Sequence, residues 1–215
     1  QGIQKSWNDG RPTDANQAGI DDVKFFNAMI SYLSPKYTIN PKMIFCTGIS
    51  NGGFMTSTLA FKLNNVFAAC AVDAASIDSV VITGNNPAAT SMIYMHGTSD
   101  PIVPFDGGTT SIGSATDGLF VSHNRAVEKW VTINHCIDNT TTTIADSAGD
   151  GTSITVSDYK NGTNVSEVIS YTINNGGHTW PGGWQYLPES VIGKTTKNLN
   201  ASETIWSFFK SHPKL

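Results

Sequence analysis

A serine flanked by glycines lies where a strand pattern gives way to a helix pattern. Ser50 is the central residue of Gly48-Ile-Ser-Asn-Gly52, which follows an apolar run at 43–47 and precedes a helical pattern at 51–63. A strand, a tight turn and a helix in this order form a nucleophile elbow, where a side chain at either glycine would collide with neighbouring backbone. The pattern predicts Ser50 as an exposed nucleophile, with the backbone N–H of Asn51 as an oxyanion donor.

A serine needs a base to accept its proton and an acid to orient that base. Asp100 follows the apolar run 91–96, and His178 lies in a glycine-flanked loop after the strand pattern at 165–173. The chain order serine, aspartate, histidine is that of the α/β-hydrolases. We therefore predict that Ser50, Asp100 and His178 form a catalytic triad, which needs no metal and no organic cofactor.

Alternatives remain open for each member of the triad. Ser50 could be an ordinary turn residue, and Asp100 could initiate a turn before Pro101, with Asp73 as a rival acid at the end of the strand pattern 66–72. Four other histidines compete with His178, although they fall in a helix, just past its end, in the tail, or close to Asp100 in sequence: His123, His135, His212 and His96.

Hydrophobic spacing predicts the elements that position these residues. After a loop over the first 13 residues, a helix begins near residue 20 and ends near Pro35, and an Asn200/Glu203 capping box begins the last helix. The Thr-rich ranges 140–156 and 165–173 predict two further strands. The other predicted strands are 43–47, 66–72 and 91–96, and the other helices are 51–63 and 118–133. This alternation predicts an α/β fold with a mostly parallel sheet flanked by helices.

The composition limits the classes of function. The 215 residues are 39% hydrophobic, enough for one domain spanning residues 1–215. Only 14% are charged and the net charge is -4, which argues against nucleic-acid binding, and no apolar run is long enough to cross a membrane. Cys46 and Cys70 lie in apolar strand patterns and favour free thiols, with one disulfide among the three cysteines as the alternative.

Several stretches resemble the polyhydroxybutyrate depolymerase-like esterases, a branch of the α/β-hydrolases that includes feruloyl and acetylxylan esterases of carbohydrate esterase family 1 type. The resemblance covers nearly the whole chain, and its most specific part is the His-Thr-Trp-Pro-Gly-Gly block at 178–183. It implies Ser50 as nucleophile, Asp100 as acid and His178 as base, in a secreted or periplasmic enzyme. The other stretches are Ser6-Trp-Asn-Asp-Gly, Gly48-Ile-Ser-Asn-Gly-Gly-Phe-Met, His96-Gly-Thr-Ser-Asp-Pro-Ile-Val-Pro and Asn200-Ala-Ser-Glu-Thr-Ile-Trp-Ser-Phe-Phe.

The leading hypothesis is a serine carboxylesterase that hydrolyses feruloyl, acetyl or similar esters of plant polysaccharide through an acyl-enzyme. The alternatives are a polyester depolymerase and a non-catalytic binding protein on the same fold. Trp180 is predicted to form a wall of the substrate site, although it could equally pack its own loop, and Trp7 and Trp184 are weaker candidates of the same kind.

The chain departs from these relatives at its N-terminal side. They carry, before the segment equivalent to Trp7-Asn-Asp, several strands and an HGGG-like loop that supplies a second oxyanion donor. Without those strands, we expect the strand at 43–47 to lack its usual neighbour on one side. Either the chain is a fragment, or it is a naturally shortened hydrolase in which a homo-oligomer covers this edge.

Overall fold

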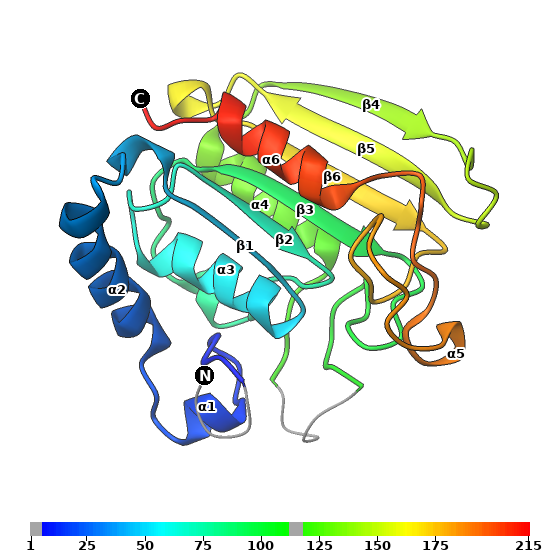
Figure 1. Ribbon diagram of the computed structural model, residues 1–215, viewed down its shortest axis with the longest axis horizontal. Coiled ribbons are helices and arrows are strands. Elements are labelled where there is room, and N and C mark those ends of the chain that lie inside the picture. The colour runs from blue at the N-terminus through cyan, green and yellow to red at the C-terminus, as the bar shows by residue number, and fades with distance from the viewer. Residues whose placement is uncertain (1–5, 112–117) are drawn as a thin grey trace.

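The computed structural model describes residues 6–111 and 118–215, and their strands form one six-stranded sheet in the order β1-β2-β3-β6-β5-β4 (Figure 1). β1, β2, β3 and β6 are parallel, whereas β5 runs antiparallel to β6 and to β4. The mostly parallel α/β sheet predicted from the alternation is therefore confirmed. The strands are β1 (Phe45–Ile49), β2 (Ala69–Asp73), β3 (Ser91–Gly97), β4 (Asp138–Ile144), β5 (Ser153–Lys160) and β6 (Val168–Asn174).

One strand prediction is wrong: the range 140–156 holds parts of two strands, β4 and β5, rather than one. The chain reverses between them, where the Asp146 carboxylate accepts the backbone N–H groups of Asp150 and Gly151. β4 is exposed along almost its whole length. Its sequence consequently lacks the alternation of apolar and polar residues that would have marked its ends.

Helices cover both faces of the sheet. Buried side chains of α3 (Asn51–Lys62) and α4 (His123–Asn134) pack with β2 and β3 on one face, around Trp130 and Tyr94. α6 (Ala201–Ser211), drawn in red in Figure 1, packs Ile205 and Phe208 on the other face. α2 (Asp22–Tyr37) adds partly buried side chains to the first cluster, and α1 (Asp14–Gln17) and α5 (Glu189–Ile192) are single turns.

Two helix boundaries differ from the prediction. α4 begins at His123 instead of residue 118, because Phe120 is extended and bridges to Gly108, and Ser122 then caps the helix by accepting the Arg125 N–H. α2 continues two residues past Pro35. The helix ends at Tyr37, and the C-cap residue Thr38 has a left-handed backbone (φ 51°) that terminates the last turn.

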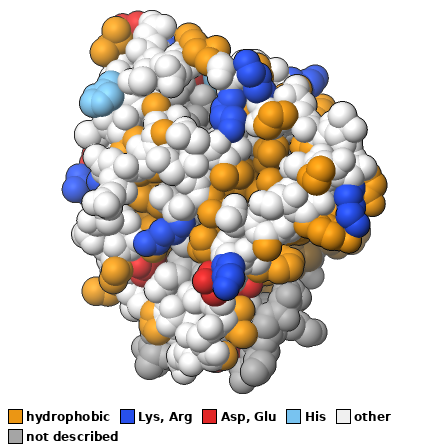
Figure 2. Space-filling view, turned by 90° about the vertical axis from the view of Figure 1, so that its left-hand side faces the viewer, with side chains coloured by type: hydrophobic (Ala, Val, Ile, Leu, Met, Phe, Trp, Pro, Cys, Tyr) orange, Lys and Arg blue, Asp and Glu red, His pale blue; other side chains and the backbone are white. Residues whose placement is uncertain are grey.

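β1 is the edge strand nearest α2 and is only half-buried. Cys46 and Cys70 are neighbours across β1 and β2, and both are free, as is Cys136. Figure 2 turns this side of the molecule toward the viewer and shows hydrophobic side chains on it. No helix of the described residues is long and apolar enough to cross a membrane. The exposed hydrophobic side chains of α2 and of the segment before β1 are Phe25, Tyr32, Tyr37, Ile39 and Met43.

Candidate active site

Ser50 occupies a strained turn between β1 and α3. Its backbone angles, φ 57° and ψ -128°, lie outside the regions that non-glycine residues favour. The Ser50 N–H donates to the carbonyl of Asp73 (3.0 Å), and its own carbonyl accepts the N–H of Phe54 (3.0 Å). These hydrogen bonds tie the turn to the end of β2 and to the first turn of α3, so the strain is held by its surroundings.

Close backbone packing explains some of the glycines at this turn. A Cβ on Gly48 would lie 2.4 Å from the backbone of Gly52, and one on Gly53 would lie 2.6 Å from the Ala75 side chain. A Cβ on Gly52 would meet no atom within 4 Å. The prediction that both glycines of the motif must be small is therefore right for Gly48 and wrong for Gly52, and Gly53 carries the second constraint.

Asp100 and His178 are hydrogen-bonded to each other. His178 Nδ1 lies 2.8 Å from Asp100 Oδ2, and Asp100 Oδ1 accepts the backbone N–H groups of Ile102 and Val103, each at 2.8 Å. Burial favours the neutral acid, but hydrogen bonds from His178 and then His96 outweigh it and lower the pKa of Asp100 to about 2. Asp100 is therefore ionised near neutral pH, and it holds the His178 proton on Nδ1, which leaves Nε2 free to act as a base.

The loop that carries His178 packs tightly against the end of β3. A Cβ on Gly97 would lie 2.2 Å from the carbonyl oxygen of Gly176. The His178 N–H donates to the Ile192 carbonyl (2.6 Å), and the Tyr186 hydroxyl donates to the His178 carbonyl (2.9 Å). The close packing of Gly97 against Gly176 and the hydrogen bonds from His178 to Ile192 and from Tyr186 to His178 together fix the position of the imidazole.

Ser50 and His178 line the same pocket, whose volume is about 360 Å³. No hydrogen bond joins their side chains in the described structure, and catalytic hydrogen bonds are often long until substrate binds. The apolar and aromatic lining comprises Phe54, Ile102, Val103, Tyr186, Leu187 and Ile192; the polar lining comprises Ser6, Arg11, Thr13, Asp14, Asn51 and Thr110.

The three tryptophans proposed to bind substrate are not among the lining residues. Trp7 packs against Phe26 with ring centroids 5.2 Å apart, and the Trp180 indole N–H donates to Ser202 Oγ. Trp184 is 84% exposed. Their role in binding substrate stays a prediction, while Tyr186 and Leu187, which no sequence motif singles out, form part of the pocket wall.

The rival acid and the rival histidines have other surroundings. Asp73 is buried, and within the described residues neither of its carboxylate oxygens has a hydrogen-bond partner. Burial, followed by the nearby Asp100 charge, raises the pKa of Asp73 well above the usual value. His123 bonds to Ser170 Oγ. His96 Nε2 lies 2.9 Å from the Val103 carbonyl and 3.4 Å from Asp100 Oδ2, so it flanks the acid. The spacing of four residues between His96 and Asp100 was the only sequence signal for this contact.

Asn51, the predicted oxyanion donor, is the first residue of α3. Its backbone N–H therefore belongs to the free first turn of a 12-residue helix, where the helix dipole favours negative charge. His135 ends α4 in a left-handed conformation, and His212 pairs with Glu167 beyond α6. The structure thus brings Ser50, Asn51 and His178 to one pocket, with Asp100 directly behind His178.

Comparisons with known proteins identify relatives among hydrolases. A model of the prolyl oligopeptidase family matches residues 2–86. NocK of Nocardia uniformis subsp. tsuyamanensis is 28% identical over 97% of this chain and 63% of its own length. Feruloyl esterase B of Piromyces equi is 27% identical over 86% of this chain and 34% of its own length. Feruloyl esterase C of Emericella nidulans is 34% identical over 51% of this chain and 38% of its own length.

A search of solved structures finds an acetyl xylan esterase from Aspergillus awamori, with a TM-score of 0.45 and 16% identity over 71% of this chain and 61% of that one. The chain spans less than two thirds of the length of NocK and of feruloyl esterase B. In sequence the chain is similar to feruloyl esterases, and its mostly parallel sheet with helices on both faces is an α/β fold.

Proposed function

We propose that this protein is a serine carboxylic-ester hydrolase in which Ser50, His178 and Asp100 form the catalytic triad. The observation that carries the proposal is the Asp100–His178 hydrogen bond of 2.8 Å at a pocket that also holds the strained Ser50. The feruloyl esterase relatives support ester chemistry in particular.

The reaction follows from the roles of these groups. His178 Nε2 takes the proton of Ser50 as its Oγ attacks the ester carbonyl, and the N–H of Asn51 donates to the oxyanion that forms. The imidazolium then gives the proton to the alcohol oxygen as the ester C–O bond breaks. The alcohol departs, and the acyl group remains bound to Ser50 as an acyl-enzyme. Water, activated by the same imidazole, attacks this ester and frees the acid and Ser50. Asp100 stabilises the imidazolium in both halves of the reaction.

The proposed substrates are feruloyl, acetyl or similar esters of plant polysaccharide. A pocket of about 360 Å³ falls within the usual range for small ligands, and the rings of Phe54 and Tyr186 offer apolar walls to an aromatic acyl group. A polyester would need room for a chain on both sides of Ser50. Rates on soluble esters compared with release from a polyester film distinguish these two substrate classes.

The central test is hydrolysis of nitrophenyl acetate, nitrophenyl butyrate and methyl ferulate by the wild type and Ser50→Ala. We expect Ser50→Ala to lower kcat by at least about 1,000-fold, because the nucleophile is lost. Ser57→Ala is the matched control, since Ser57 lies in the same helix but bonds to Tyr94 in the core. Retained turnover in Ser50→Ala would refute the assignment, and failure of a fluorophosphonate to label Ser50 would favour a non-catalytic binding protein.

A further inference from the structure

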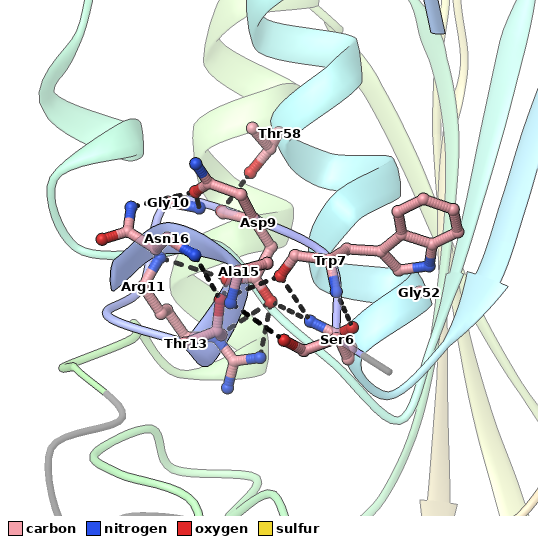
Figure 3. A network of polar contacts seen from close by, with 12 residues as sticks. Ser6, Trp7, Asp9, Gly10, Arg11, Thr13, Ala15, Asn16, Gly52 and Thr58 are labelled. Atoms are coloured by element: carbon pink, nitrogen blue, oxygen red, sulfur yellow. Dashed lines mark hydrogen bonds and ion pairs between the residues drawn. The ribbon is translucent and has the colours of Figure 1, made fainter. Parts of the chain in front are cut away.

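The side chain of Asn51 is held by the loop that precedes α1. Its Oδ1 accepts the Trp7 N–H (2.6 Å), and its Nδ2 donates to the Trp7 carbonyl (3.2 Å) and to Asp9 Oδ2 (2.6 Å). The carboxamide thus uses its acceptor and its donors on one short loop segment. Figure 3 shows this loop, with Trp7 and Asp9, beside the start of α3. The residue that carries the proposed oxyanion donor is therefore fixed from the side chain as well as from the helix.

Asp9 is itself fixed by a buried ion pair. Arg11 Nη2 lies 2.6 Å from Asp9 Oδ2, and Arg11 Nε lies within 3.2 Å of both carboxylate oxygens. Asp9 is fully buried and Arg11 is 4% exposed. The Arg11 guanidinium carbon also lies 3.6 Å from the ring centroid of Phe54, in the first turn of α3. Thr58 of the same helix donates its hydroxyl to the Asp9 carbonyl. The pair therefore connects the loop to α3 through Asn51, Phe54 and Thr58.

The positions of the Asp9 and Arg11 charges suit a site where negative charge develops. An unpaired carboxylate hydrogen-bonded to Asn51 would oppose an oxyanion at the neighbouring N–H, and a buried charge needs a partner. Arg11 supplies that partner and lines the pocket, whereas Asp9 is not among the lining residues. Arg11 Nε and Nη2 both donate to Asp9, and Nη1 has no hydrogen-bond partner in the described structure.

We propose that Asp9 and Arg11 are positioning residues for the oxyanion hole: Asp9 orients Asn51, and Arg11 neutralises Asp9. This inference rests on the proposed esterase function. It assigns a role to Asp9 and Arg11, which the triad does not account for. It also explains why residue 51 is an asparagine, because an aspartate could not donate to Asp9 and an alanine would lose the side-chain hydrogen bonds to Trp7 and Asp9.

A double-mutant cycle on Asp9→Ala and Asn51→Ala tests the proposal, since both variants keep the backbone N–H of residue 51. We expect each single variant to lower kcat by about 10-fold with KM changed less than twofold, because a displaced donor costs less than the roughly 100- to 1,000-fold of a lost one. The double variant should be no slower than the slower single variant, because both changes remove one connection. The rate of fluorophosphonate labelling should fall in parallel.

Asn8→Ala is the matched control: Asn8 bonds to Ile20 and Asn16 in the same loop without touching Asn51, and its kcat should stay near the wild-type value. If Asp9→Ala does not fold, Asp9→Asn replaces it, and its loss of kcat should be smaller because its amide oxygen still accepts from Asn51. The inference would be overturned if the kcat losses of the two single variants multiplied in the double variant, or if the variants changed KM alone. Either result would leave the esterase function intact. A wild type inert to both esters and fluorophosphonate would overturn both.

Discussion

At the scale of single residues, environment decides which of two buried carboxyl groups can serve as the acid. Asp100 receives two backbone N–H groups and the His178 imidazole, and its pKa falls to about 2. The two carboxyl oxygens of Asp73 have no hydrogen-bond partner in the described structure, and burial raises the pKa of this group. Asp100 is therefore ionised near pH 7, whereas burial favours the neutral form of Asp73, although both lie at the carboxyl ends of parallel strands of the same sheet.

Substitution of the two carboxyl groups should separate their roles. We expect Asp100→Asn to lower kcat by about 1,000-fold or more, because an amide no longer selects the Nδ1–H tautomer of His178. Asp73→Asn should leave kcat within a few-fold of wild type. Steady-state kinetics on nitrophenyl acetate, with circular dichroism to confirm folding, provides the measurement. A large loss in Asp73→Asn with an active Asp100→Asn would transfer the role of acid to Asp73.

The same pKa shifts predict opposite dependences of stability on pH. The folded-state pKa of Asp100, about 2, lies below its ordinary value of 3.8, so its stabilisation is present above pH 3.8 and is lost as the pH falls toward 2. The pKa of Asp73 is raised, so its contribution is present below pH 3.8 and is lost as the pH rises. Between pH 4 and pH 2, the free energy of unfolding measured in urea should fall by about 2 kcal/mol less in Asp100→Asn than in the wild type. Equal losses in the two proteins would contradict this assignment.

The elbow motif, the strand patterns before each residue, their chain order and the family resemblance together predicted Ser50, Asp100 and His178. The contacts of His96 with Asp100 and of Asn51 with Asp9 were not predictable. They depend on how loops fold back over the sheet, which hydrophobic periodicity does not encode.

At the scale of elements, buried strands and amphipathic helices were predicted well, and exposed ones poorly. β2 and β3 are buried along their whole length and appear as apolar runs, whereas β4 is exposed and merged with β5 in the prediction. Burial imposes a pattern on the sequence, and exposure removes it. The pocket walls from 186–192 lie in a loop and in the single turn of α5, which leave no extended periodic pattern in the sequence. Their position follows from contacts such as that of Tyr186 with His178.

The elbow offers a paired test of close packing between β1 and α3. Gly48→Ala should destabilise the fold by about 1–3 kcal/mol and lower kcat, because its Cβ would lie 2.4 Å from the Gly52 backbone. Gly52→Ala should keep the wild-type stability or gain up to about 1 kcal/mol, since it meets no atom and lies in a helix. Denaturant melts of both variants give the comparison, and equal stabilities would show that the turn relaxes around a side chain.

At the scale of the whole molecule, the described sheet ends at β1 on the side of α2. The sequence predicted that this edge lacks a neighbour, and the structure confirms that β1 is an edge strand of the described sheet. Phe25, Tyr32 and Met43, in α2 and in the segment before β1, are exposed. Figure 2 shows hydrophobic side chains on this side of the molecule. The hydrophobic patterns of this chain do not predict which surface covers this side, because the matching residues would belong to that surface.

An apolar edge of this kind favours association, so we expect the 215-residue chain to self-associate through β1. Thr47→Lys should weaken association, because Thr47 is the exposed position of β1 and a lysine there opposes strand pairing. Thr141→Lys is the matched control on β4, the opposite edge of the sheet, and should leave the association unchanged. Size-exclusion chromatography with light scattering over a range of concentrations measures the mass. A soluble, active wild-type monomer at every concentration would show that β1 needs no partner, and equal effects of both lysines would place the contact elsewhere.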